Sequence, residues 1–204
     1  MPSKRKVSNL LALAVLSYLS QQPMHPYELG RNLREHGDDR SIKYNHGSLY
    51  MVVGQLARAG FITEQETGRA GQRPERTVYA LTDTGRAELR DWLRELVGEP
   101  EPEFTAFEAA LSVVGILPPD EVIALLGKRA DTIEANLAEH RTRLREVMKA
   151  VPRLLLIEIE YKLAIAEAEA RWVRSLVTEL TDGTMPDMHL WHEFQARLRK
   201  EPEK

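Results

Sequence analysis

The stretch "NHGSLYMVVGQLARAG", residues 45–60, has the pattern of a helix with one apolar side. Leu49, Val53 and Leu56 recur at helical spacing, and we expect them to face a core. Asn45 is expected to cap this helix, because its side-chain oxygen can accept a hydrogen bond from a free backbone N–H of the first turn. The opposite side carries two glycines and several polar side chains, and it comprises Gly47, Ser48, Tyr50, Met51, Gly54, Gln55 and Arg58.

That opposite side indicates that an outside molecule comes close to the helix. Each glycine disfavours a helix by up to about 1 kcal/mol relative to alanine, so two of them on one face need a reason. The free N–H groups of a helix start bind phosphate readily. Ser48 and Tyr50 can donate to phosphate oxygens, and Gln55 and Arg58 can reach farther. The alternative is that this face packs against the rear half of the chain.

The elements around this helix follow the order of a winged helix-turn-helix. We expect one helix over residues 7–19, apolar nearly all round and therefore central, and a second over 26–36 that Pro26 begins. Residues 61–67 and 76–82 are rich in β-formers and flank the basic tip "GRAGQRPE", which predicts a two-stranded hairpin. A further helix, capped by Thr82, should run to about Val97. In this fold the third helix enters the major groove and the wing touches the DNA backbone or minor groove.

The composition is that of an ordinary soluble globular protein, and its charge is unevenly distributed. The 204 residues include no cysteine, which excludes disulfides and cysteine-ligated metals. The net charge is -3, but residues 1–98 hold 14 Lys or Arg against 11 Asp or Glu, and residues 99–204 hold 14 against 20. A basic front half and an acidic rear half are compatible with nucleic acid at the front.

The beginning of the chain superficially resembles a signal peptide. A basic cluster at residues 4–6 precedes an apolar run over residues 10–19. That run is too short to span a bilayer, and no small-residue cleavage site follows it, so it is interpreted as a buried helix. We therefore expect a cytoplasmic protein that does not enter a membrane.

The Pro/Glu-rich segment "GEPEPE", residues 98–103, is expected to separate two domains. The first is a winged helix-turn-helix over residues 1–98, and the second is a helical, coiled-coil-like domain over 104–200. In the second we expect helices over about 105–116, from Pro119 to just before Pro152, and over 153–180. A last amphipathic segment carries Leu190, Trp191, Phe194 and Leu198 on one side. The predicted fold class is therefore mainly α with a small β-hairpin.

The first long helix of the rear half carries a heptad seam. Its members alternate at spacings of three and four residues, which is typical of a coiled coil; they are Ile123, Leu126, Ala130, Ile133, Leu137, His140, Leu144, Val147 and Val151. The second long helix has two apolar faces, one from Ile159 to Leu180 and the other through Tyr161, Ala168 and Trp172. Two faces need two partners, so we expect the rear half to form a homodimer. The expected interface residues are Ile123, Leu126, Ile133, Leu137, His140, Leu144, Val147 and Trp172.

Three stretches resemble the PadR family of bacterial transcriptional regulators. They are "LAVLSYLSQQPMHPYELGRNL", "GSLYMVVGQLARAGFI" and "GQRPERTVYALTDTGRAEL", which together cover about residues 8–97. The resemblance implies a homodimer formed by C-terminal helices that binds a palindromic operator and usually represses. It also implies that Tyr50 and the wing residues Arg73 and Arg76 contact phosphates. The sequence departs from the family pattern at Asn45-His46, where Ser-Pro is more usual, and at Gln72 and Glu75, which dilute the basic wing.

The expected DNA-binding set combines the helix face with the wing. It consists of Asn45, His46, Ser48, Tyr50, Gln55, Arg58, Arg69, Arg73 and Arg76.

Several other residues admit two interpretations. His189, His192 and Glu193 are too few for a metal site and are better explained as a solvated helix face, so we expect no metal and no cofactor. His140 is either a polar residue that sets the register of the seam or a pH-sensitive dimer contact. Trp92 and Trp172 either pack in a core or interface or line a pocket for a small aromatic effector.

Enzyme chemistry has no support in the sequence, which lacks a nucleophile elbow, a P-loop and a dinucleotide glycine pattern. The prediction is a sequence-specific DNA-binding regulator that acts as a ligand-responsive repressor. The rival is a protein–protein adaptor that uses a degenerate winged helix and the long helices.

Overall fold

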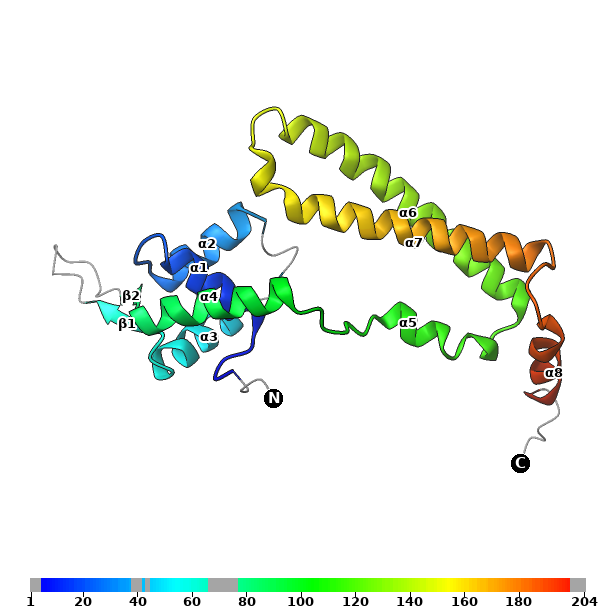
Figure 1. Cartoon of the computed structure of the whole chain (residues 1–204), viewed down its shortest axis with the longest axis horizontal. Coiled ribbons are helices and arrows are strands. Elements are labelled where there is room, and N and C mark those ends of the chain that lie inside the picture. The colour runs from blue at the N-terminus through cyan, green and yellow to red at the C-terminus, as the bar shows by residue number, and fades with distance from the viewer. Residues whose placement is uncertain (1–4, 38–41, 43–44, 66–76, 199–204) are drawn as a thin grey trace. The chain divides into compact units, whose positions relative to one another are not determined.

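A computed structural model describes residues 5–37, 42, 45–65 and 77–198. The chain divides into two compact units, residues 1–102 and 103–204, which are described separately. The first unit contains α1 (Leu10–Leu19), α2 (Pro26–Glu35), α3 (His46–Arg58), β1 (Ile62–Gln65), β2 (Val78–Leu81) and α4 (Asp83–Gly98). The second contains α5 (Ala106–Leu111), η2 (Val114–Ile116), α6 (Pro119–Val147), η3 (Arg153–Leu155), α7 (Ile157–Thr181) and α8 (Met188–Leu198). Both are drawn in Figure 1.

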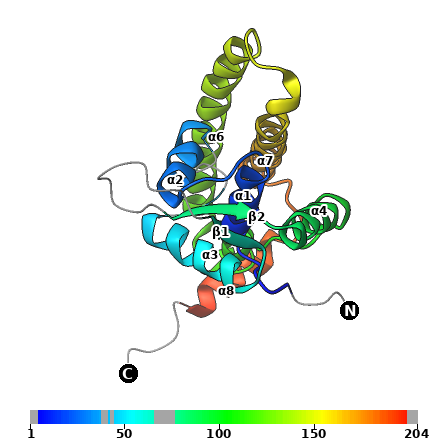
Figure 2. The ribbon, with the colours of Figure 1, turned by 90° about the vertical axis from the view of Figure 1, so that its left-hand side faces the viewer.

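The first unit is built around α1, which lies between α2, α3 and α4 (Figure 2). As predicted, α1 is apolar nearly all round, and Leu11, Val15 and Leu16 are fully buried. It begins at Leu10 rather than Val7, because the side chain of Asn9 accepts a hydrogen bond from the Leu11 N–H at 2.9 Å and caps the helix. Val7 precedes the helix but is still part of the core.

The wing is the predicted antiparallel hairpin, with Ile62 opposite Leu81 and Gln65 opposite Val78. A contact that the sequence did not indicate extends it. Met24, just before α2, pairs with Tyr79 through two backbone hydrogen bonds of 3.0 Å. The base of the wing is therefore fixed to the start of α2, the helix that precedes α3.

The second unit is a hairpin of two long helices, α6 and α7, which lie side by side (Figure 1). The two helices bury Leu126 and Ala130 of α6 with Val173 and Leu180 of α7. Ion pairs join their exposed edges, and the Nε of Arg129 donates to Glu169 at 2.7 Å. Exposed pairs of this kind contribute little energy, so the apolar seam provides most of the stability. Both helices are shorter than predicted, since α6 ends at Val147 and α7 starts at Ile157.

This packing corrects part of the expected dimer interface. Leu126 and Leu137 were assigned to a contact with a second chain, but both are buried within one chain. Ile123 also packs in the core that α6 and α7 share, so α7 of the same chain covers this part of the seam. His140 is exposed, and its Nδ1 lies 2.6 Å from the carbonyl oxygen of Asn136 on its own helix.

The two predicted faces of α7 are both present. The face that contains Ala170, Val173 and Leu180 is buried against α6. The other face is open, with Tyr161 68% and Trp172 50% exposed. One of the two apolar faces of α7 is therefore not covered by the described residues.

The last helix, α8, folds back onto η2 and the residues before α6. The Trp191 Nε1–H donates to the carbonyl oxygen of Leu117 at 3.0 Å, and the buried Gln195 amide donates to Gly115 and Leu117. His189, His192 and Glu193 lie exposed on the other side of α8. Within the residues described, no group of three His, Cys, Asp or Glu side chains is placed to hold a metal ion.

Trp92, one of the two candidates for an effector pocket, lies in the core of the first unit. It is only 3% exposed, and the Arg5 guanidinium lies 5.6 Å from its ring centre. Sequence spacing alone does not distinguish a core tryptophan from one that lines a pocket. Trp172, by contrast, lies half exposed beside Phe107, with their ring centres 6.3 Å apart in an edge-on arrangement.

Candidate nucleic-acid interface

The start of α3 is held by a reciprocal capping box. The Asn45 Oδ1 accepts from the Ser48 N–H, and the Asn45 N–H donates to the Ser48 hydroxyl, each at 2.8 Å. The Ser48 hydroxyl also donates to the Asn45 carbonyl oxygen at 2.8 Å. Both the N–H and the hydroxyl hydrogen of Ser48 are thus used inside the cap. This arrangement changes the role expected for Ser48, which shapes the helix start and does not present a free donor to phosphate.

The apolar side of α3 is wider than the sequence pattern indicated. Leu49, Val53 and Leu56 are buried as predicted, and Val52 is buried with them. Gly30 of α2 permits close packing here, since a Cβ at that position would lie 3.1 Å from the Leu49 side chain. The core therefore holds α3 along one side, and the other side of the helix does not pack in the core.

The exposed side of α3 carries the polar and aromatic groups that were expected there. Tyr50 is 44% and Met51 53% exposed, and the rings of His46 and Tyr50 lie 5.0 Å apart at the first turn. Arg58 is exposed at the last turn. A Cβ added to Gly54 would come within 4 Å of only the flexible end of Arg58, so no packing within the described part of the unit requires a glycine.

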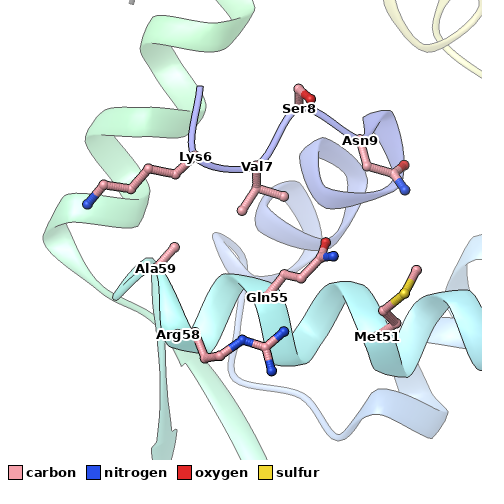
Figure 3. A pocket seen from close by; sticks show the side chains of 8 residues that line it. All are labelled: Lys6, Val7, Ser8, Asn9, Met51, Gln55, Arg58 and Ala59. Carbon is pink, nitrogen blue, oxygen red and sulfur yellow. The ribbon is translucent and has the colours of Figure 1, made fainter. Parts of the chain in front are cut away.

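Gln55 lies at the flank of this exposed side and not at its centre. It is half-buried and lines a shallow hollow together with Met51, Arg58 and residues 6–9 of the N-terminal segment (Figure 3). No sequence motif predicted that the residues before α1 would border α3. The wing residues Arg69, Arg73 and Arg76 lie outside the described residues.

The base of the wing is polar but well ordered by hydrogen bonds. The Tyr79 hydroxyl donates to Glu64 across the strands at 3.2 Å. Burial, and then the adjacent Glu64 carboxylate, raise the pKa of the Tyr79 phenol above its usual value. The phenol therefore stays protonated at neutral pH and can keep donating this bond.

Residues 15–91 match the model of the transcriptional regulator PadR-like family, and this span includes α3 and both strands of the wing. The negative transcriptional regulator PadR of Bacillus subtilis is 28% identical over 142 residues, which cover 68% of this chain and 75% of that protein. Over residues 15–91 the chain is similar to the PadR-like family. The match agrees with the prediction of a transcriptional regulator, and regulators of this family are not enzymes.

Solved structures of PadR from B. subtilis share the fold. The complex with operator DNA has a TM-score of 0.63 at 23% identity, and it covers 84% of this chain and 99% of that chain. The complex with p-coumaric acid has a TM-score of 0.67 at 22% identity, and the match covers 85% of this chain and 99% of that chain. The combination of a winged helix with long C-terminal helices is thus a fold known in the PadR-like family. In the described part of the chain, no helix is both long and apolar enough to cross a membrane.

Proposed function

We propose that this PadR-like regulator is a ligand-responsive repressor that binds a palindromic operator as a homodimer. The observation that carries the proposal is the exposed side of α3. Its capped start, its two outward-facing glycines and its lack of any acidic residue suit a helix that lies against DNA. The DNA complex of the B. subtilis relative supports this use of the fold.

The exposed side of α3 divides into base-facing and phosphate-facing groups. The N-terminal part of a recognition helix meets base edges, which places His46, Gly47 and Tyr50 nearest the bases or the phosphates beside them. Gly54 leaves room at the middle of the helix for the DNA surface. We assign Gln55 and the amide of Asn45 to direct or flanking contacts, and the wing arginines at 69, 73 and 76 to the phosphate backbone.

The homodimer is proposed from the open face of α7. Tyr161 is 68% and Trp172 50% exposed. Large amphipathic side chains of these two types are enriched at the centre of protein interfaces. The seam of α6 is partly covered within the chain, so the face of α7 is the better candidate for the second copy. Ile133, His140, Leu144 and Val147 of α6 are proposed to lie at the edge of the same contact.

The proposed effector is a small planar aromatic molecule. A relative binds p-coumaric acid. In this chain an apolar hollow of the second unit is lined by Phe107, Leu111, Val114 and Leu125, among others. The Arg129 guanidinium, which is paired with Glu169, stacks 3.6 Å from the ring centre of Phe107. Trp172 meets Phe107 edge-on, with ring centres 6.3 Å apart, and would report on binding.

The experiment is a footprint on the DNA directly upstream of the chain's own coding region, with and without a panel of phenolic acids. A repressor of this kind is expected to protect two symmetric half-sites, and the right acid should release the protection and change Trp172 fluorescence. If no compound alters the protection or the Trp172 fluorescence, the proposal of an aromatic effector is wrong. If the chain neither protects that DNA nor binds any duplex, the proposed repressor function is wrong.

A further inference from the structure

Residues 5–9, the N-terminal strap, lie between α4 and α3 before α1 begins (Figure 3). Alternate side chains of the strap are anchored. The Arg5 side chain is 10% exposed and pairs with Glu88 at 2.7 Å and with Glu95, both on α4. Val7 is buried in the core, and Asn9 caps α1. The strap is therefore fixed to the folded unit at three points within five residues.

Arg5 is held by more than its ion pairs with Glu88 and Glu95. Its guanidinium also lies over the buried Trp92 ring, and Asp91 is 3.5 Å away. A buried cation costs free energy unless it is paired, and here carboxylates and an aromatic face surround it. Among the residues described, the Arg5 Nε is the one buried side-chain nitrogen or oxygen without a hydrogen-bond partner. Such an arrangement fixes the path of the strap more than it adds stability.

Because residues 5, 7 and 9 are anchored, Lys6 and Ser8 are left on the outside. Figure 3 shows the strap along one side of the hollow and α3 along the other, with Lys6 on the strap and Arg58 on α3. Lys6 and Arg58 are both exposed, and within the described residues neither forms an ion pair. Neither the strap nor α3 contains an acidic residue. The hollow thus has two uncompensated cations on its rim and hydrogen-bonding groups from Ser8 and Gln55.

We propose that the N-terminal strap is a further DNA contact, in which Lys6 contacts a phosphate of the backbone beside α3. Arg5 is the positioning residue, since it touches no DNA and fixes Lys6 through α4. The inference rests on the proposed DNA-binding function, because the hollow opens beside the exposed side of α3. It adds a contact that is independent of both the wing and the base-facing side chains.

The test is the salt dependence of binding of the full chain to a mixed-sequence DNA duplex. Lys6→Gln removes one phosphate contact, so the slope of log affinity against log salt should become shallower by about 0.9, and affinity should fall on all sequences alike. Arg94→Gln is the matched control, because it removes an exposed cation of α4 that does not line the hollow. The control should keep the wild-type slope.

The positioning role of Arg5 has its own readout. Arg5→Gln should increase hydrogen exchange at residues 5–9 in the free protein, and in that background Lys6→Gln should no longer change the slope. If the wild-type chain binds DNA with a steep salt dependence and Lys6→Gln does not change that slope, the strap contact is wrong and the proposed function stands. A wild-type chain that binds no duplex would overturn both. Equal effects of Lys6→Gln with and without Arg5 would overturn the positioning role.

Discussion

Replacing Gly85 with alanine is expected to lower the stability of the winged-helix unit by roughly 3 kcal/mol, near the top of the range for overpacking. Gly85 lies in the first turn of α4, where its N–H donates to the Thr82 hydroxyl at 3.0 Å. An added Cβ would lie 2.8 Å from the carbonyl carbon of Phe61, closer still to its oxygen, and 2.9 Å from the Leu81 side chain. Backbone on one side leaves little room to relax, so α4 and the wing must separate.

Hydrogen exchange over α4 and β1, measured by mass spectrometry, checks this expectation for the one unit without interference from the other. Gly98→Ala is the matched control, because a Cβ at that last residue of α4 meets no atom within 4 Å. It should leave protection unchanged or raise it slightly, since alanine favours a helix. Wild-type protection in Gly85→Ala would mean that α4 does not pack on Phe61 as described.

Replacing both Tyr161 and Trp172 with glutamate is expected to abolish the homodimer. In a two-fold interface each substitution occurs twice, and a central aromatic residue contributes about 2 kcal/mol or more. The dissociation constant should therefore rise by a factor of at least about 1000. Each monomer should remain folded, because both side chains lie on the exposed face of α7 and not on the face buried against α6.

Sedimentation equilibrium of the variant and the wild type measures this effect. Tyr27→Glu is the control, because it introduces the same charge at a tyrosine of the first unit that is 55% exposed. The control should sediment as the wild type does. A double variant that remains dimeric, with helical content unchanged, would show that the second copy binds elsewhere, and the face of α7 would lose its assignment.

Local sequence signals were sufficient for the elements that carry the candidate interface. The cap at Asn45 and the apolar spacing of residues 49, 53 and 56 act within single turns, so the position of α3 could be predicted closely. The same holds for Pro26 at the start of α2 and Thr82 at the start of α4. These signals depend on neighbours a few residues away, and they do not need the tertiary fold to be interpreted.

Contacts between distant residues could not be predicted in the same way. A heptad seam shows that α6 needs a partner, but it does not distinguish α7 of the same chain from a second copy. The sequence does not show that Trp92 is buried in a core beneath Arg5, because the two residues are far apart along the chain. The pairing of Met24 with Tyr79 and the course of the strap beside α3 also depend on tertiary packing, for which a single sequence gives no periodic signal.

The central claim is that the exposed side of α3 lies against DNA, and Gly54→Glu tests it most directly. The fold should tolerate this change, because only the end of Arg58 is near and glutamate favours a helix over glycine. The measurement is the affinity for a duplex from upstream of the coding region, with Gly98→Glu as a control of equal charge. The account predicts that Gly54→Glu loses at least about 100-fold in affinity, through bulk and charge repulsion of a few kcal/mol, while the control binds as the wild type does. Wild-type affinity in Gly54→Glu would contradict it.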